Sequence, residues 1–127
     1  MGPSESINRA LNAFFNGFGI PGYLEDNIPP AASLPYLTYK PTIPGEWNET
    51  TSFHARLWYP SKGGRAPILQ IEDTISAAFP RGGLKIECEG GAILLDKDDK
   101  DWAQPLNNTP EGYLCEYLIF ELTRLIP

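Results

Sequence analysis

One histidine, His54, is the first residue in this sequence with the chemistry of a general base or a zinc ligand. The chain has a single histidine, so any imidazole that acts in catalysis must be this one. Ser52 precedes it by two positions, and on a strand the two side chains would share one face. A serine hydrolase also needs a group that orients the histidine and donors for the oxyanion, and the sequence indicates neither. We therefore expect an exposed or edge histidine and no hydrolase.

A glycine-rich string, GFGIPG at residues 17–22, matches the G-x-G-x-x-G spacing of dinucleotide-binding loops. Such a loop binds pyrophosphate when a strand precedes it and a helix begins within it, so that helix amides point at the phosphates. Here a predicted helix precedes the string, and proline-rich chain follows it. We expect a helix stop and a turn, and no nucleotide cofactor.

The run DKDDKD at residues 96–101 carries four carboxylates, which are the oxygen ligands that calcium prefers. The run departs from a calcium loop, since Lys100 stands at the third ligand position and Asp101 replaces the invariant glycine. Its two lysines also oppose the negative field. We expect a solvated loop without a metal, in which Asp98 and Asp99 are candidates for contact with a partner protein.

Two cysteines and two glutamates share the predicted strand region without forming a reactive group. Cys88 and Cys115 fall on apolar strand positions and lack C-x-x-C spacing, which is typical of small core residues. Glu87 and Glu89 share the opposite strand face, where no apolar pocket would raise a carboxyl pKa. We therefore predict core thiols, outward carboxylates and a protein that is not an enzyme.

Three tryptophans, Trp47, Trp58 and Trp102, fall on predicted loops or on the polar face of a strand. Tryptophan is enriched in the centres of protein interfaces, so each is a candidate interface residue. The alternative is that they cap the rim of the hydrophobic core. The sequence leaves these two roles open.

Composition places the chain among small globular proteins. It has 127 residues, of which 42% are hydrophobic and 20% charged, so we expect one domain over residues 1–127 that folds without a metal or a disulfide. The net charge of −6 argues against specific nucleic-acid binding, which depends on lysine and arginine contacts to phosphates. We also expect no secretory signal, because residues 1–6 lack a basic and apolar leader, and no membrane span, because no apolar run approaches ~20 residues.

Two helices are predicted from apolar stripes at helical spacing. Ile7, Ala10, Leu11, Phe14 and Phe15 form the stripe of a helix from about Glu5 to Asn16. Ile68, Ile71, Ile75 and Phe79 form the stripe of a second helix between Pro67 and Phe79, with Glu72, Asp73 and Ser76 turned away. Between the first helix and the next strand, residues 17–35 hold four prolines and are expected to be an extended connector.

Five strands are predicted from alternation and from β-favouring residues. Gly90 and Gly91 suit the two-residue turn of a hairpin. The last strand also carries leucines at helical spacing, but its aromatic and β-branched residues favour a central strand covered on both faces. The order α-β-β-α-β-β-β predicts an α+β fold with an antiparallel or mixed sheet packed by two helices. The predicted strands cover Tyr36–Tyr39, Thr51–Tyr59, Leu84–Cys88, Ala92–Leu95 and Tyr113–Ile126.

This arrangement resembles the tail terminator, or tail completion, proteins of long-tailed bacteriophages, the family that includes the minor tail protein U of phage lambda. The likeness covers nearly the full chain and rests on spacing and a few residues. Its carriers are the first helix, LPYLTY at 34–39, the strand end LWY at 57–59, the helix at 68–79, WAQP at 102–105 and the strand at 113–125.

The resemblance implies a structural subunit of a homo-oligomeric ring, typically a hexamer, in the virion tail and in the host cytoplasm during assembly. Such a ring caps the tail tube protein, terminates tail growth and binds the head connector protein, and DNA passes through it. The loops 43–50 and 96–108 would then be free for contacts between subunits.

Three alternatives remain open at this level. Related head-tail joining proteins are close competitors for the same role. A non-catalytic module could dock one protein partner through its tryptophan-bearing loops. An enzyme would have to use His54 or the run at residues 96–101.

Overall fold

The structure, a computed structural model, describes residues 3–98 and 102–125. The predicted α+β class is confirmed, because the described residues form two helices and one mixed seven-stranded sheet in the order α-β-β-β-α-β-β-β-β. The helices are α1 (Pro3–Phe15) and α2 (Ala66–Ala77). The strands are β1 (Gly22–Leu24), β2 (Tyr36–Lys40), β3 (Thr50–Pro60), β4 (Leu84–Cys88), β5 (Gly91–Lys97), β6 (Ala103–Pro105) and β7 (Tyr113–Leu125).

The sheet runs in the order β1-β2-β3-β7-β5-β4, and β6 also pairs with β7. β1 and β2 are parallel, whereas the other described pairs are antiparallel. β3 pairs with β7 along all of its eleven residues. On the other side of β7, β5 pairs with its second half and β6 with its first half. The last predicted segment is thus confirmed as a central strand.

β1 lies inside the segment that the sequence predicts to be only a connector. It is three residues long and pairs with β2 at the edge of the sheet, where prolines on either side of it interrupt no central ladder. The first residue of this strand, Gly22, has to be a glycine, because a Cβ there would lie 2.8 Å from the Phe15 carbonyl oxygen. The glycine therefore allows β1 to pack directly against the end of α1.

Two further strand details differ from the prediction. The segment 96–108 contains β6, whose three residues extend the sheet beside β7. In the β4–β5 hairpin Cys88 is paired with Gly91, so the turn consists of Glu89 and Gly90 and lies one residue earlier than predicted. Gly90 supplies the positive φ of 80°, while Gly91 is needed because a Cβ would meet the Leu125 carbonyl oxygen.

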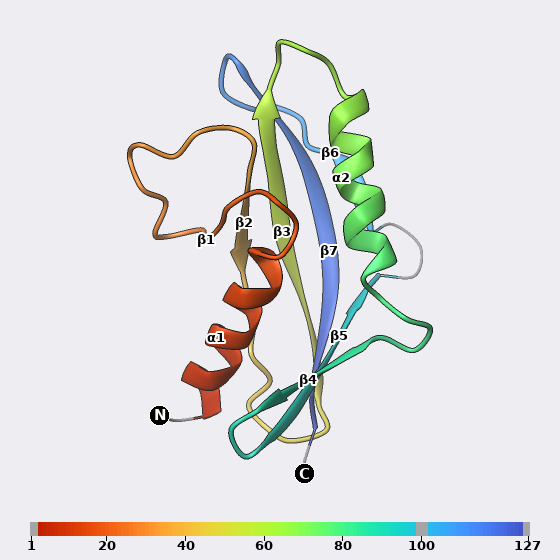
Figure 1. Cartoon of the computed structure of the whole chain (residues 1–127). Helices are drawn as coiled ribbons and strands as arrows, with labels where there is room; N and C mark the ends of the chain where they lie inside the picture. Colours follow the sequence, from red (N-terminus) through yellow and green to blue (C-terminus); the bar gives the residue numbers. More distant parts are fainter. Residues whose placement is uncertain (1–2, 99–101, 126–127) are drawn as a thin grey trace.

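Both helices cover the same face of the sheet (Figure 1). α1 buries the predicted residues Ile7, Leu11 and Phe15, and the Phe15 ring packs against inward rings of the sheet at 4.6 to 6.3 Å. α2 buries Ile68 and Ile75. This face, between the helices and the sheet, contains the hydrophobic core.

The sequence predicts that Glu72 points to solvent, and the structure shows that this prediction is wrong. Its residue is only 5% exposed. It follows Ile68 by four positions and precedes Ile75 by three, so all three share one face of α2. The helix ends at Ala77, and Phe79 packs beyond it against the core.

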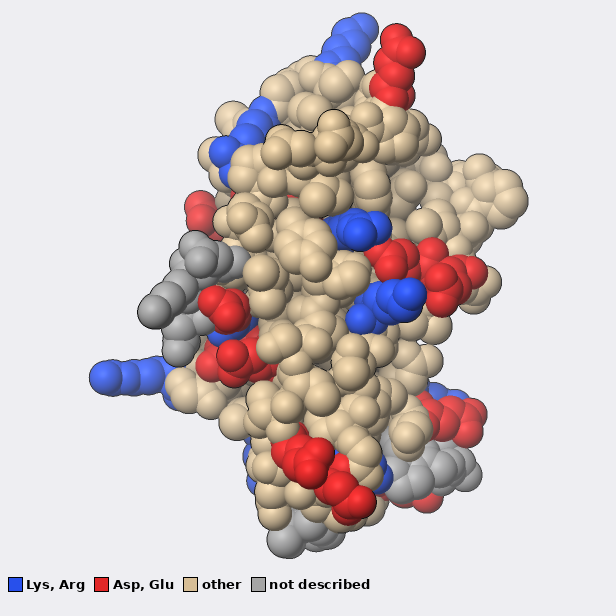
Figure 2. Space-filling model, turned by 180° about the vertical axis from the view of Figure 1, so that it is seen from behind, with Lys and Arg blue, Asp and Glu red and all other residues tan. Residues whose placement is uncertain are grey.

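The opposite face of the sheet, called the open face below, has no helix on it among the described residues. The prediction that β7 is covered on both sides is therefore wrong. Thr38 and Cys115 are buried between larger neighbours on this face, and Figure 2 shows it as a largely uncharged surface with a few charged side chains side by side. The side chains that the pairing directs to it include Tyr23, Tyr36, Thr38, Lys40, His54, Arg56, Trp58, Tyr113, Cys115, Tyr117 and Ile119.

Candidate functional site

A cluster of charged and aromatic side chains occupies the middle of the open face. His54 and Arg56 alternate outward on β3, and Glu25, just after β1, reaches both of them. Glu25 Oε1 lies 2.9 Å from an Arg56 guanidinium nitrogen and 3.5 Å from His54 Nε2. The His54 ring stacks on Tyr117 with centroids 4.9 Å apart and an interplanar angle of 20°. The cluster therefore ties β1, β3 and β7 together.

Glu25 is the orienting partner of His54 that the sequence does not indicate, because it lies in a different segment. It does not complete a hydrolase triad. Its charge is shared with Arg56, and the His54 Nε2 that would take a proton from a nucleophile faces this carboxylate. Neither of the pockets described below is lined by His54. The cluster is suited to fixing the shape of the open face.

Aromatic side chains continue the open face beyond this cluster. The Trp58 indole nitrogen donates a hydrogen bond to Thr38 Oγ1 at 3.0 Å, and its ring meets Tyr113 edge to face at 6.3 Å. Tyr23 and Tyr36 form a second edge-to-face pair at 5.7 Å. Tyr113 is 40% exposed. The hydrogen bond fixes Trp58 on this aromatic surface, on which Tyr113 is an exposed ring.

Trp47 lies away from the open-face rings, at the β4–β5 turn. Its ring is covered by the Arg124 guanidinium, 4.2 Å from the centroid, and it approaches Gly91 so closely that a Cβ there would lie 2.8 Å from it. Arg124 also donates a hydrogen bond to the Pro44 carbonyl at 3.2 Å. Trp47 thus packs against the end of the sheet at the β4–β5 turn.

Trp102 packs against the core on the helix side. Its ring meets Phe120 at 6.3 Å, and the Lys97 ammonium lies 5.4 Å from its centroid. The structure therefore does not bring the three tryptophans into one surface. Asp98 is half-buried and its amide donates to the Ile119 carbonyl at 2.9 Å, while Asp99 lies outside the described residues.

A buried charged cluster lies beneath α2. Glu116, on β7, is 0% exposed and forms an ion pair with Arg65, which precedes α2. Burial, and then the charge of Glu116, raise the pKa of the neighbouring Glu72 to about 7. Burial also raises the pKa of Tyr59 beside this cluster. One carboxylate oxygen of Glu72 and one of Glu116 have no hydrogen-bond partner within the described ranges. The cluster is therefore sensitive to protonation.

The two thiols match the predicted inert character. Burial raises the pKa of Cys115 to about 12 and also raises the pKa of Cys88. A thiol reacts as its thiolate, so neither cysteine is a ready nucleophile near neutral pH.

Two pockets mark the surface. One, of about 160 Å³, lies where β3 ends and α2 begins. The other, of about 410 Å³, is an open hollow between residues 104–108 and Tyr117. In the part of the chain that the structure describes, no three histidine, cysteine or carboxylate side chains gather in a way that could hold a metal ion.

Comparison with known proteins identifies the fold only. No family model matches the chain, and no curated protein matches it. A solved NMR structure that carries no functional name matches with a TM-score of 0.60 and 15% identity, over 98% of this chain and 94% of that one. At this identity the likeness concerns architecture. No helix among the described residues is long and apolar enough to cross a membrane.

Proposed function

We propose that this protein is a structural subunit of a homo-oligomeric ring that caps a bacteriophage tail tube, terminates tail growth and joins the tail to the head. The observation that carries the proposal is the open face of the sheet. It presents Trp58, Tyr113 and Tyr117 on the two longest strands, with no helix over them among the described residues. Tyrosine and tryptophan are enriched in interfaces because each combines a large apolar ring with a hydrogen-bonding end.

The polar groups of the face support an assembly role over catalysis. Glu25 is held by Arg56, and His54 is stacked on Tyr117. These contacts fix the side chains before a partner arrives, so that binding would cost little conformational entropy. A catalytic site requires instead a reactive group that faces a cavity.

The choice of a tail terminator among assembly proteins rests on the resemblance in helix and strand arrangement. The acidic character fits it, because a net charge of −6 would let DNA pass a ring without being retained. The partners would be further copies of this chain, the tail tube protein and the head connector protein.

The test is assembly in the presence of a phage tail tube protein. Light scattering coupled to size-exclusion chromatography, with negative-stain imaging, should show rings that bind the ends of tubes. Tyr113→Arg should weaken this association at least about tenfold, because a charge would enter an apolar contact. Ala13→Arg is the matched control, since Ala13 is exposed on α1, on the other side of the sheet. A chain that stays monomeric at high concentration and ignores tubes would refute the proposal.

A second candidate is a non-catalytic module that docks one protein partner on the same face. The contact between Trp58 and Tyr113 supports it equally well. The two functions differ in stoichiometry. A module would bind one partner as a monomer, whereas the ring protein associates with itself.

A further inference from the structure

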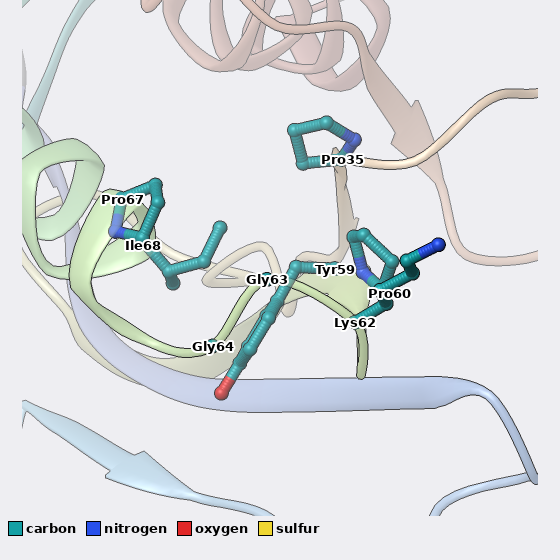
Figure 3. Close-up of a pocket in the computed structure, with 8 residues that line it drawn as sticks. All are labelled: Pro35, Tyr59, Pro60, Lys62, Gly63, Gly64, Pro67 and Ile68. Atoms are coloured by element: carbon teal, nitrogen blue, oxygen red, sulfur yellow. The ribbon is translucent and has the colours of Figure 1, made fainter.

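A small apolar pocket opens where β3 gives way to α2. Its volume is about 160 Å³, and its walls include Tyr59, Ile68 and three prolines, Pro35, Pro60 and Pro67. Figure 3 shows the Tyr59 ring along one wall, with its hydroxyl at the end distant from Pro35. A proline ring fixes its own backbone φ angle, so the part of the wall formed by the prolines is rigid.

The size and lining of this pocket limit what it can hold. Cofactor and ligand sites are typically about 300–1,000 Å³, so this one is too small for them. It is suited to one branched aliphatic side chain, since apolar rings and Ile68 surround the space. Lys62, Gly63 and Gly64 complete the lining, and Lys62 gives it a positive charge.

The chain itself carries a side chain of this kind. Ile28 is 38% exposed and lies in the loop between β1 and β2, with Asp26 before it and Pro29 and Pro30 after it. Figure 1 shows this loop projecting from the β1 side of the sheet, away from α2. Exposed isoleucine on a proline-stiffened loop is preorganised to insert into a pocket.

Opposite charges favour contact between the loop and the pocket. Asp26 is exposed beside Ile28, and Lys62 is exposed at the pocket. Within the described ranges neither of them forms an ion pair. Identical acidic subunits repel one another, so a pair of opposite charges at one contact would select this orientation over others.

We propose that Ile28 of one subunit inserts into the pocket of the next subunit, with Asp26 facing Lys62. This inference rests on the proposed function, because it names the contact by which the ring closes. The exposed Ile28 and the pocket are different surfaces of the subunit. In the proposed contact each subunit inserts Ile28 into one neighbour and receives Ile28 from another, so the contact is head to tail. Repeated head-to-tail contacts form rings when the rotation closes.

The experiment uses charge reversal in the full chain. Asp26→Lys and Lys62→Glu should each weaken self-association at least about tenfold, because each places like charges at the contact. The chain that carries both changes should regain most of the association, since the pair is then reversed. Sedimentation velocity measures the self-association, with tube protein present if rings need it. Arg81→Glu is the matched control, because Arg81 is exposed after α2, lies outside the pocket and forms no ion pair within the described ranges.

Ile28→Ser tests the apolar part of the contact and should also weaken association about tenfold. Its control is Leu69→Ser, because Leu69 is equally exposed on α2 but does not line the pocket. Rings that persist in both single charge variants would overturn this inference and leave the proposed function standing. Variants at Asp26 or Ile28 that still form rings but no longer bind tubes would also overturn the inference, because the loop would then bind the tube. A wild-type chain without rings would remove the proposed function itself.

Discussion

Replacing Glu72 by glutamine tests the buried charges beneath α2. The folded-state pKa of Glu72 is about 7, against an ordinary value of 4.5. A raised folded-state pKa means that the protonated carboxyl stabilises the fold. This stability is fully present below about pH 4.5 and is lost as the pH rises through about 7. At about 1.4 kcal/mol per pH unit, the whole loss is about 3 kcal/mol, most of which falls between pH 5 and pH 8.

Glutamine has the shape of the protonated carboxyl and does not ionise. Glu72→Gln should therefore be within about 1 kcal/mol of wild type near pH 5 and about 3 kcal/mol more stable at pH 8. Urea unfolding at a series of pH values measures this, with the difference between the two proteins as the result. Contributions from titratable groups that the two proteins share cancel in the difference.

The control is Glu87→Gln, because the Glu87 side chain is 79% exposed on β4 and should change little at either pH. A difference between wild type and Glu72→Gln that does not vary from pH 5 to pH 8 would refute the reasoning. It would mean that Glu72 stays charged in the folded protein, with Arg65 compensating both carboxylates.

Two other predictions concern packing and reactivity. Gly22→Ala should destabilise the fold by about 1–3 kcal/mol, because its Cβ would lie within 3.0 Å of Phe15 and the strand would have to shift. In thermal unfolding, Gly45→Ala should stay within about 0.5 kcal/mol, since no atom lies within 4 Å of that Cβ position; equal effects of the two changes would contradict the close approach. Cys115 should react with a thiol reagent at pH 8 only after unfolding, and rapid labelling of the native protein would show that its burial is incomplete.

Much of the fold follows from local patterns. The stripe of α1 and the alternation of β3 are set by residues close in sequence, so the periodicities of 3.6 and 2 reveal them. β1 and β6 have three residues each, too few for any periodicity. Each exists because a longer strand beside it offers free backbone groups. Pairing across the chain decides these two strands, which a local pattern does not contain.

The charged and aromatic surfaces show the same division. Alternation along β3 predicts that Trp58 and His54 point outward together. It does not predict that Tyr113 and Glu25 meet them, because this depends on the register between distant strands. The sequence pattern misplaces Glu72 because a charged residue ordinarily points outward. Its buried neighbour Glu116 belongs to another element, so a local pattern does not reveal it.

The position of β7 in the chain has a consequence for folding during translation. The strands β1, β2 and β3 form one group, and β4 and β5 form another, and β7 pairs with both groups. It is also the last strand along the described chain. Until β7 has been translated, the two groups have no strand in common, so the complete sheet cannot form. Because the outward residues of β3 and β7 together form the open face, a nascent chain has no complete surface with which to associate prematurely.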